Sequence, residues 1–356
     1  MHGDQIMKSD LYSIKKRVAG LSYAFTENGV ELPVLDITHP LFISSIDEVK
    51  LKEMLKKAEK NAEKTAEKFN NMPPYIMKFL AKRSFTMAEL LQHKGDNAYL
   101  SGVSTLMLKL GPDLIGKGRK RFLDRLASRG IGGMVLRMRV RDLSICQAKA
   151  LIPILRKSPD KNLCIINIAG GAASDTINTL FLILQEDPLL LKNRKIEIYV
   201  LDIDSFGPAF AAECISVLKS PAGQFNNLNI SFRHIQYDWN NTSLLNKLLS
   251  ERKDWLIACS SEGGLFEYCS DEVIDKNLDT LYNNSNSELI ITGSLLHDIE
   301  NVDAGIIASL KISTNIKPKF LGLEGLKNIC GKYWTIASII EGNPRYLVFC
   351  MKKTCN

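Results

Sequence analysis

Short apolar runs alternate with longer stretches of helical periodicity from residue 161 to the end of the chain. This alternation is typical of a parallel sheet with helices on both faces. The last two runs flank Gly342, Asn343 and Pro344, which predicts an antiparallel hairpin-like end. We therefore expect an α/β sheet of seven strands, mostly parallel with an antiparallel last strand. The expected strands are residues 163–168, 196–201, 229–236, 255–259, 289–292, 334–340 and 346–352.

The part of the chain before this sheet, residues 1–155, is predicted to be mainly helical, with one extended segment at 30–37. Glu and Lys recur at helical spacing over residues 45–69, which favours an exposed helix. Further helices are expected at 75–81, 86–92, 98–110, 122–127 and 144–155. Gly130, Gly132 and Gly133 predict either a flexible joint or a simple turn. We expect two domains: a helical cap over residues 1–155 that encloses a substrate, and a sheet domain over 156–356.

Composition and charge favour a globular protein and argue against a nucleic-acid-binding one. The 356 residues are 45% hydrophobic and 24% charged, as in ordinary globular proteins. The net charge of +7 lies mainly before residue 141, in runs such as 117–121. Stacking aromatics are not interleaved with these basic residues, so a solvated face is favoured over a nucleic-acid site. No nucleic-acid partner is expected.

The eight cysteines form no C-x-x-C pair and no Cys/His cluster at zinc spacing. The N-terminus lacks the apolar stretch of a signal peptide, and no run approaches the roughly 20 apolar residues that span a bilayer. These features predict a cytoplasmic protein without a metal ion and without a membrane partner. The sequence leaves open whether the protein forms a homodimer.

Small residues follow the first expected strand of the sheet. The segment after Ile166 reads Asn-Ile-Ala-Gly-Gly-Ala-Ala-Ser-Asp, and an apolar helix over 176–185 comes next. Small residues let the backbone approach a ligand closely, and a helix start offers free N–H groups. The segment therefore predicts a turn that can bind a carboxylate or phosphate.

Acidic residues end the next two strands. Asp202 and Asp204 come about thirty residues after the turn, where a carboxylate can accept both hydroxyls of a ribose. Asp238 and Trp239 end the third strand, where adenine would lie. Open α/β sheets bind ligands outside the carboxyl ends of their strands, so the three segments are expected to meet at one nucleoside site.

These segments resemble the class I S-adenosylmethionine-dependent methyltransferases, which share a glycine-rich first turn and acidic ends to strands two and three. The resemblance covers the chain from about residue 161 and implies a Rossmann-like sheet with S-adenosyl-L-methionine as cofactor. It implies that Gly170 and Gly171 border the methionine moiety, that Asp202 holds the ribose, with Asp204 as the alternative, and that Asp238 faces the adenine amino group. The remaining cofactor-binding candidates are Asn167, Ala169, Ile203, Trp239 and Ser260.

The chain departs from that family at the turn. Asn167 stands where the family usually has an acidic residue, and Ala169 and Ala173 stand where glycine is common. These departures leave room for a non-catalytic scaffold that binds a nucleoside. A nicotinamide-dependent oxidoreductase is a further alternative, although the G-x-G-x-x-G pattern of dinucleotide sites is absent.

The segment after the fourth strand contains Glu262, two glycines and Tyr268. It is locally similar to the leucine carboxyl methyltransferase branch, where such a segment lies beside cofactor and substrate. The resemblance implies catalytic roles for Glu262 and Tyr268 near the point of methyl transfer. An equally weighted alternative is that Glu262 fixes the loop and Tyr268 caps the core.

Methyl transfer is an in-line displacement, which depends mostly on alignment in a dry site. A hydroxyl or protonated amine acceptor must also lose a proton. His297 follows the fifth strand and is the best candidate base, with a hydrogen-bonded loop residue as the alternative. Tyr99, Ser101 and Gly102 are expected either to reach the methionine end of the cofactor or to lie in a buried helix with small residues at a close contact. We predict methylation of a small molecule at O or N rather than C.

Overall fold

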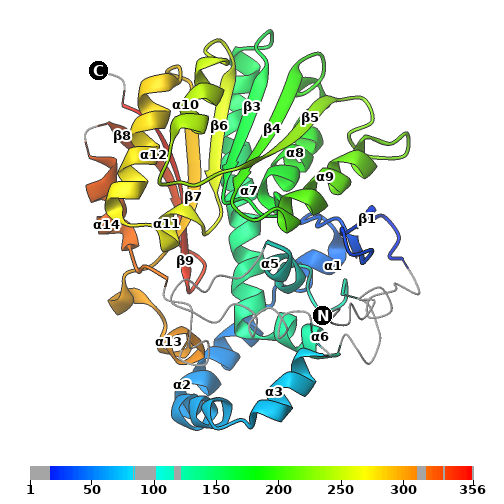
Figure 1. The fold of residues 1–356 in the computed structure, drawn as a ribbon, viewed down its shortest axis with the longest axis vertical. Coiled ribbons are helices and arrows are strands. Elements are labelled where there is room, and N and C mark those ends of the chain that lie inside the picture. Colours follow the sequence, from blue (N-terminus) through cyan, green and yellow to red (C-terminus); the bar gives the residue numbers. More distant parts are fainter. Residues whose placement is uncertain are drawn as a thin grey trace, which may run out of the picture.

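The computed structural model describes residues 17–82, 84, 102–115, 122–310, 318–331 and 333–354. A twisted sheet lies between two layers of helices, and a group of helices lies beyond one end of its strands (Figure 1). Among the described residues, no helix is long and apolar enough to cross a membrane. The seven described cysteines are buried and form no disulfide.

The sheet has seven strands in the order β5-β4-β3-β6-β7-β9-β8. The first five of these pair in parallel, while β9 pairs antiparallel with both β7 and β8. The predicted seven-stranded, mostly parallel sheet with an antiparallel last strand is therefore confirmed. The bounds are β3 Leu163–Ile168, β4 Lys195–Asp202, β5 Asn229–Gln236, β6 Leu256–Ser261, β7 Ile290–Leu296, β8 Trp334–Ile340 and β9 Tyr346–Lys353.

Two hydrophobic cores lie on opposite faces of the sheet, because successive side chains of a strand point to opposite sides. Ile165 of β3 belongs to one core and Ile166 to the other, and neither is exposed to solvent. The first core contains residues of α7 (Ile131–Lys157), α8 (Ser174–Glu186) and α9 (Phe206–Lys219). The second contains residues of α10 (Ser243–Ser250), α12 (Asp271–Asn284) and α14 (Gly322–Cys330).

A small hairpin near the N-terminus packs against the first helical layer. It consists of β1 (Tyr23–Phe25) and β2 (Glu31–Pro33), and α1 (Pro40–Ile43) follows it. The buried amide of Asn178 in α8 accepts a hydrogen bond from the N–H of Ile37 (2.8 Å) and donates one to the carbonyl of Leu35 (2.9 Å). The N-terminal segment is thereby fixed to the sheet layers.

The helical cap lies beyond the carboxyl ends of the parallel strands (Figure 1). It comprises α2 (Glu48–Asn70), α3 (Pro74–Ala81), α5 (Gly102–Lys109), α6 (Phe122–Arg129), the start of α7 and α13 (Ala304–Leu310). Helix α13 comes from the C-terminal half and packs closely on α2, since a Cβ at Gly305 would lie 2.4 Å from the carbonyl oxygen of Leu55. The cap core includes Leu296 and Tyr346, which belong to strands of the sheet.

Helix α7 runs through the segment for which the sequence predicts either a flexible joint or a turn. It begins at Ile131 and continues for 27 residues, so Gly132 and Gly133 are helical. A Cβ at Gly133 would lie 2.3 Å from the carbonyl oxygen of Ser128, which makes the glycine a tight contact between α6 and α7. Neither a turn nor a flexible joint spans residues 130–133, because Gly130 is the N-cap of α7 and the two later glycines lie within the helix. The helix expected over 86–92 and the start of that over 98–110 lie outside the described residues.

Candidate functional site

The turn after β3 has an unusual backbone. Ala169, Gly171 and Ala173 all have positive φ, at 54°, 49° and 50°. For an L-residue with a side chain, the left-handed region costs roughly 1–2 kcal/mol, so the two alanines are strained where glycine would not be. The turn therefore has the conformation that a glycine-rich loop would adopt, although glycine occupies only Gly171 among these three positions.

Asp202 connects this turn to the end of β4. The N–H of Gly171 donates to its Oδ2 (2.8 Å), and the N–H of Asp204 donates to its Oδ1 (3.0 Å). Burial raises the pKa of Asp202 although both N–H groups favour the ionised form. Each carboxylate oxygen accepts more than one hydrogen bond, so Asp202 retains capacity for a ribose hydroxyl.

The other residues expected around a nucleoside lie on the solvent side of these strand ends. Ile203 is 59% exposed, a large value for an isoleucine. Asp238 is exposed at the end of β5, and Trp239 beside it is partly buried against the core. Hydrogen bonds from Asn240 hold the pKa of Asp238 below its ordinary value. An apolar surface, an aromatic ring and two carboxylates therefore lie at adjacent strand ends, which fits the adenosine part of the expected cofactor.

Three glycines pack backbone against backbone at the turn. A Cβ on Gly102 of α5 would lie 2.6 Å from the Cα of Gly171, and a Cβ on Gly207 of α9 would lie 2.9 Å from it. Helix α5 therefore makes a close backbone contact with the turn after β3 at Gly102, as expected of a buried helix with a small residue there. Tyr99 and Ser101, which precede it, lie outside the described residues.

Asn167 and Ser260 lie beneath the turn and are fully buried. Asn167 Nδ2 donates to Asp175 Oδ1 (2.7 Å), and Ser260 Oγ donates to Asp175 Oδ2 (2.8 Å). Burial and the nearby charge of Glu262 raise the pKa of Asp175. The two residues predicted to touch a cofactor thus hold a buried carboxyl group in this structure.

Glu262 lies in an ion-pair network between the sheet and the cap. Its two oxygens are bound by Lys109 Nζ of α5 (2.8 Å) and by Arg139 Nε of α7 (3.2 Å), and its side chain is 5% exposed. Arg139 Nη1 also donates to Glu267 (2.9 Å) in α11 (Leu265–Tyr268). The guanidinium of Arg139 lies over the ring of Tyr346, 4.4 Å from its centroid.

This geometry favours the structural reading of Glu262, because cations engage both of its oxygens. Gly263 has a φ of 73°, and a Cβ there would lie 2.4 Å from Arg139 Nη1, so the turn requires glycine. Sequence reasoning missed Lys109 and Arg139. The available signal was weak: Lys109 ends an apolar helical run, whereas Arg139 is one of three arginines at alternate positions from 137 to 141.

Tyr268 and His297 lie at the same edge of the sheet, toward β9. Tyr268 is 39% exposed. Ring nitrogen Nε2 of His297 lies 2.9 Å from the carbonyl oxygen of Asn343 in the turn between β8 and β9. A carbonyl only accepts, so Nε2 carries the proton and Nδ1 keeps the lone pair. Nε2 of His234 likewise lies within hydrogen-bond distance of a backbone carbonyl, that of Asp202 (2.9 Å).

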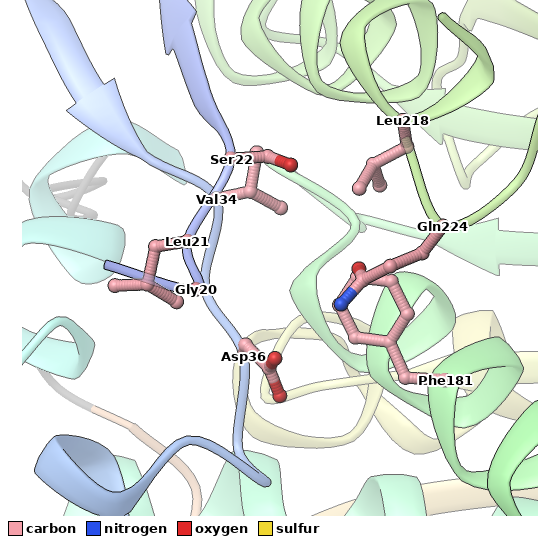
Figure 2. A pocket seen from close by; sticks show the side chains of 8 residues that line it. All are labelled: Gly20, Leu21, Ser22, Val34, Asp36, Phe181, Leu218 and Gln224. Atoms are coloured by element: carbon pink, nitrogen blue, oxygen red, sulfur yellow. The ribbon is translucent and has the colours of Figure 1, made fainter. Parts of the chain in front are cut away.

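A small pocket lies away from this edge (Figure 2). It encloses about 160 Å³, including open solvent, between the β1–β2 hairpin, α8 and α9. Ligand sites are usually about 300–1,000 Å³, so it is too small for a nucleoside cofactor. Its Asp36 already accepts hydrogen bonds from the N–H and hydroxyl of Thr38. The lining residues are Gly20, Leu21, Ser22, Val34, Asp36, Phe181, Leu218 and Gln224.

No protein-family model and no curated protein sequence matches the chain. The chain is similar in structure to a "possible exported protein" of Bordetella parapertussis. That match has 12% identity and a TM-score of 0.52, and covers 86% of this chain and 97% of that one. At this identity the likeness concerns the fold alone.

Weaker likenesses extend to proteins connected with S-adenosylmethionine or with biosynthesis. The pyocyanin biosynthetic protein PhzM matches at 11% identity with a TM-score of 0.39, over 66% of this chain and 60% of its own. The protein LepI, in complex with S-adenosylmethionine, matches at 9% identity with a TM-score of 0.37, over 55% of this chain and 44% of its own.

Proposed function

We propose that the protein is a methyltransferase that uses S-adenosyl-L-methionine to methylate a small molecule at oxygen or nitrogen. The observation that carries this proposal is the hydrogen bond from Gly171, in a turn with repeated positive φ, to the strand-end carboxylate of Asp202. Asp238 at the next strand end adds the second acidic position. The sheet order, with an antiparallel β9 between β7 and β8, is the one that the resemblance implies.

In this proposal the chain's own residues bind and orient the cofactor. Gly170 and Gly171 lie beside its methionine moiety, Asp202 accepts from the ribose, and Asp238 faces the adenine. Ile203 and Trp239 contact the adenine ring. The bound cofactor supplies an electrophilic methyl group, and alignment with the acceptor accounts for most of the rate.

His297 is the proposed base for acceptors that must lose a proton. Its Nδ1 keeps the lone pair while Nε2 is held by the turn at Asn343. Glu262 is proposed as a positioning residue that holds α5 and α7 over the strand ends through Lys109 and Arg139. Tyr268 remains a proposed contact of the acceptor. The expected location of the protein is the cytoplasm.

A calorimetric titration with S-adenosylhomocysteine, the demethylated cofactor, tests this function. We expect micromolar binding to the natural protein and loss of at least about tenfold in affinity in Asp202→Ala, because a hydrogen bond to a charged group contributes about 1.5–3 kcal/mol. Asp238→Ala should weaken binding in the same direction.

Matched titrations separate the alternatives. Asp187→Ala, which removes a half-buried turn carboxylate at the far end of α8, should bind as the natural protein does. NAD should produce no heat if the site is a methyl-donor site. Binding of NAD without binding of S-adenosylhomocysteine would establish the oxidoreductase alternative, and no heat from either ligand would refute the proposed function.

A further inference from the structure

Arg345 is a half-buried cation at the carboxyl edge of the sheet. Its guanidinium lies over the ring of Tyr346, 5.0 Å from the centroid, and its Nε is buried without a hydrogen-bond partner. No side chain in the described part of the chain forms an ion pair with it. A buried donor left unsatisfied costs about 1–3 kcal/mol, so such a group requires an explanation.

The backbone around Arg345 is rigidly held. Asn343 Oδ1 accepts from the N–H groups of Arg345 (3.0 Å) and Tyr346 (3.2 Å), while Asn343 Nδ2 donates to the carbonyl of Val135 in α7 (2.7 Å). The N–H of His297 donates to the carbonyl of Arg345 (3.3 Å). The turn is therefore tied both to α7 and to the end of β7, and it presents the guanidinium from a fixed backbone.

The neighbouring charges do not neutralise Arg345. Burial raises the pKa of Glu267 and the charge of Arg345 opposes that rise, but Oε1 of Glu267 is already bound by Arg139 (2.9 Å). Glu262 is bound by both Lys109 and Arg139. Two carboxylates thus face three cations in this network, and the unpaired one is Arg345. Asp175 is not an ion-pair partner of Arg345, because its two carboxyl oxygens accept hydrogen bonds from Asn167 and Ser260 beneath the turn after β3.

Building on the proposed function, we propose that the methyl acceptor carries an oxyanion, a carboxylate or a phosphate, that binds Arg345. The planar guanidinium can donate two parallel hydrogen bonds to such a group. Tyr268 is a partly exposed residue that interacts electrostatically with Arg345, and it offers a phenolic donor. The N–H of His297 donates to the carbonyl of Arg345, so an oxyanion bound at Arg345 would hold the acceptor beside the proposed base.

Calorimetric titrations with sodium benzoate and with inorganic phosphate test this inference, each performed with and without saturating S-adenosylhomocysteine. We expect at least one anion to bind the natural protein in the millimolar range, and the anion that binds identifies the class of oxyanion. Arg345→Gln should weaken that binding by about tenfold or more. Arg345→Lys, which keeps the charge but loses the planar fork, should weaken it by less. If Arg345→Gln fails to fold, Arg345→Lys provides the test.

Arg156→Gln is the matched control, because Arg156 forms an exposed pair with Glu186 at the other end of α7. It removes the same charge and should bind the anion as the natural protein does. Unchanged anion binding in Arg345→Gln, or no binding of either anion to the natural protein, would overturn the inference. Binding of S-adenosylhomocysteine without the anion leaves the proposed function intact. Binding of the anion without S-adenosylhomocysteine refutes that function and leaves an oxyanion site.

Discussion

Single residues at the cofactor turn show how its conformation is kept with few glycines. Ala169 and Ala173 adopt the left-handed backbone at a cost of roughly 1–2 kcal/mol each. A Cβ at Gly264 would lie 2.2 Å from the Cβ of Ala169, so Ala169 occupies the space that a side chain at position 264 would need. The conformation of the turn is therefore fixed by its surroundings as well as by its own residues.

Asp175 gives this site a predicted dependence on pH. Burial and Glu262 raise the pKa of its carboxyl above the usual value of about 3.9. A raised folded-state pKa means that the group's contribution to stability is present below about pH 4 and is lost as the pH rises through that pKa. Asp175→Asn stays neutral and can still bond with Asn167 and Ser260. Relative to the natural protein, its free energy of unfolding should therefore rise between about pH 4 and pH 7.

Urea unfolding at a series of pH values measures this difference. Asp238→Asn is the control without a slope in this range, because the pKa of Asp238 is lowered and its contribution is lost only as the pH falls below about 4. A constant difference between Asp175→Asn and the natural protein across this range would show that the carboxyl of Asp175 is not perturbed by folding.

At the scale of elements, the buried ion pairs hold α5 and α7 against the segment after β6. Arg139 forms ion pairs with Glu262 and Glu267. Lys109 forms an ion pair with Glu262 alone. Arg139→Met should therefore lower the free energy of unfolding by about 3–5 kcal/mol, since it leaves buried carboxylates short of a partner. Lys109→Met should cost less, about 1–3 kcal/mol.

Urea unfolding of these variants tests the ranking. Glu267→Gln added to Arg139→Met should recover part of the loss, because the two residues are in contact and their effects are not additive. Equal losses of unfolding free energy in Arg139→Met and Lys109→Met would contradict the prediction that Arg139 stabilises the network more than Lys109. So would no recovery in the double variant.

Helix α7 shows why some elements escaped sequence reasoning. An amphipathic stripe predicts a helix only where one face is exposed. Most of α7 is buried on all sides, including Arg137 and Arg139, so its first half lacked that periodicity. The strands were predictable because buried parallel strands form short continuous apolar runs.

For the whole molecule, the sheet and the strand-end carboxylates could be predicted because they follow one another along the chain. The links between cap and sheet could not, because the pairs Lys109–Glu262 and Arg139–Glu267 join residues 153 and 128 positions apart. The packing of α13 on α2 is similarly distant in sequence. The residues proposed to bind the cofactor thus lie in local segments of the sequence, whereas those proposed to surround the acceptor depend on tertiary contacts.

A crystal structure of the complex with S-adenosylhomocysteine tests the central claim most directly. The account predicts that the ligand lies over the carboxyl ends of β3, β4 and β5, with ribose hydroxyls about 2.7–3.0 Å from Asp202 and the adenine beside Ile203 and Trp239. A ligand bound elsewhere, or bound here with its ribose away from Asp202, would contradict it.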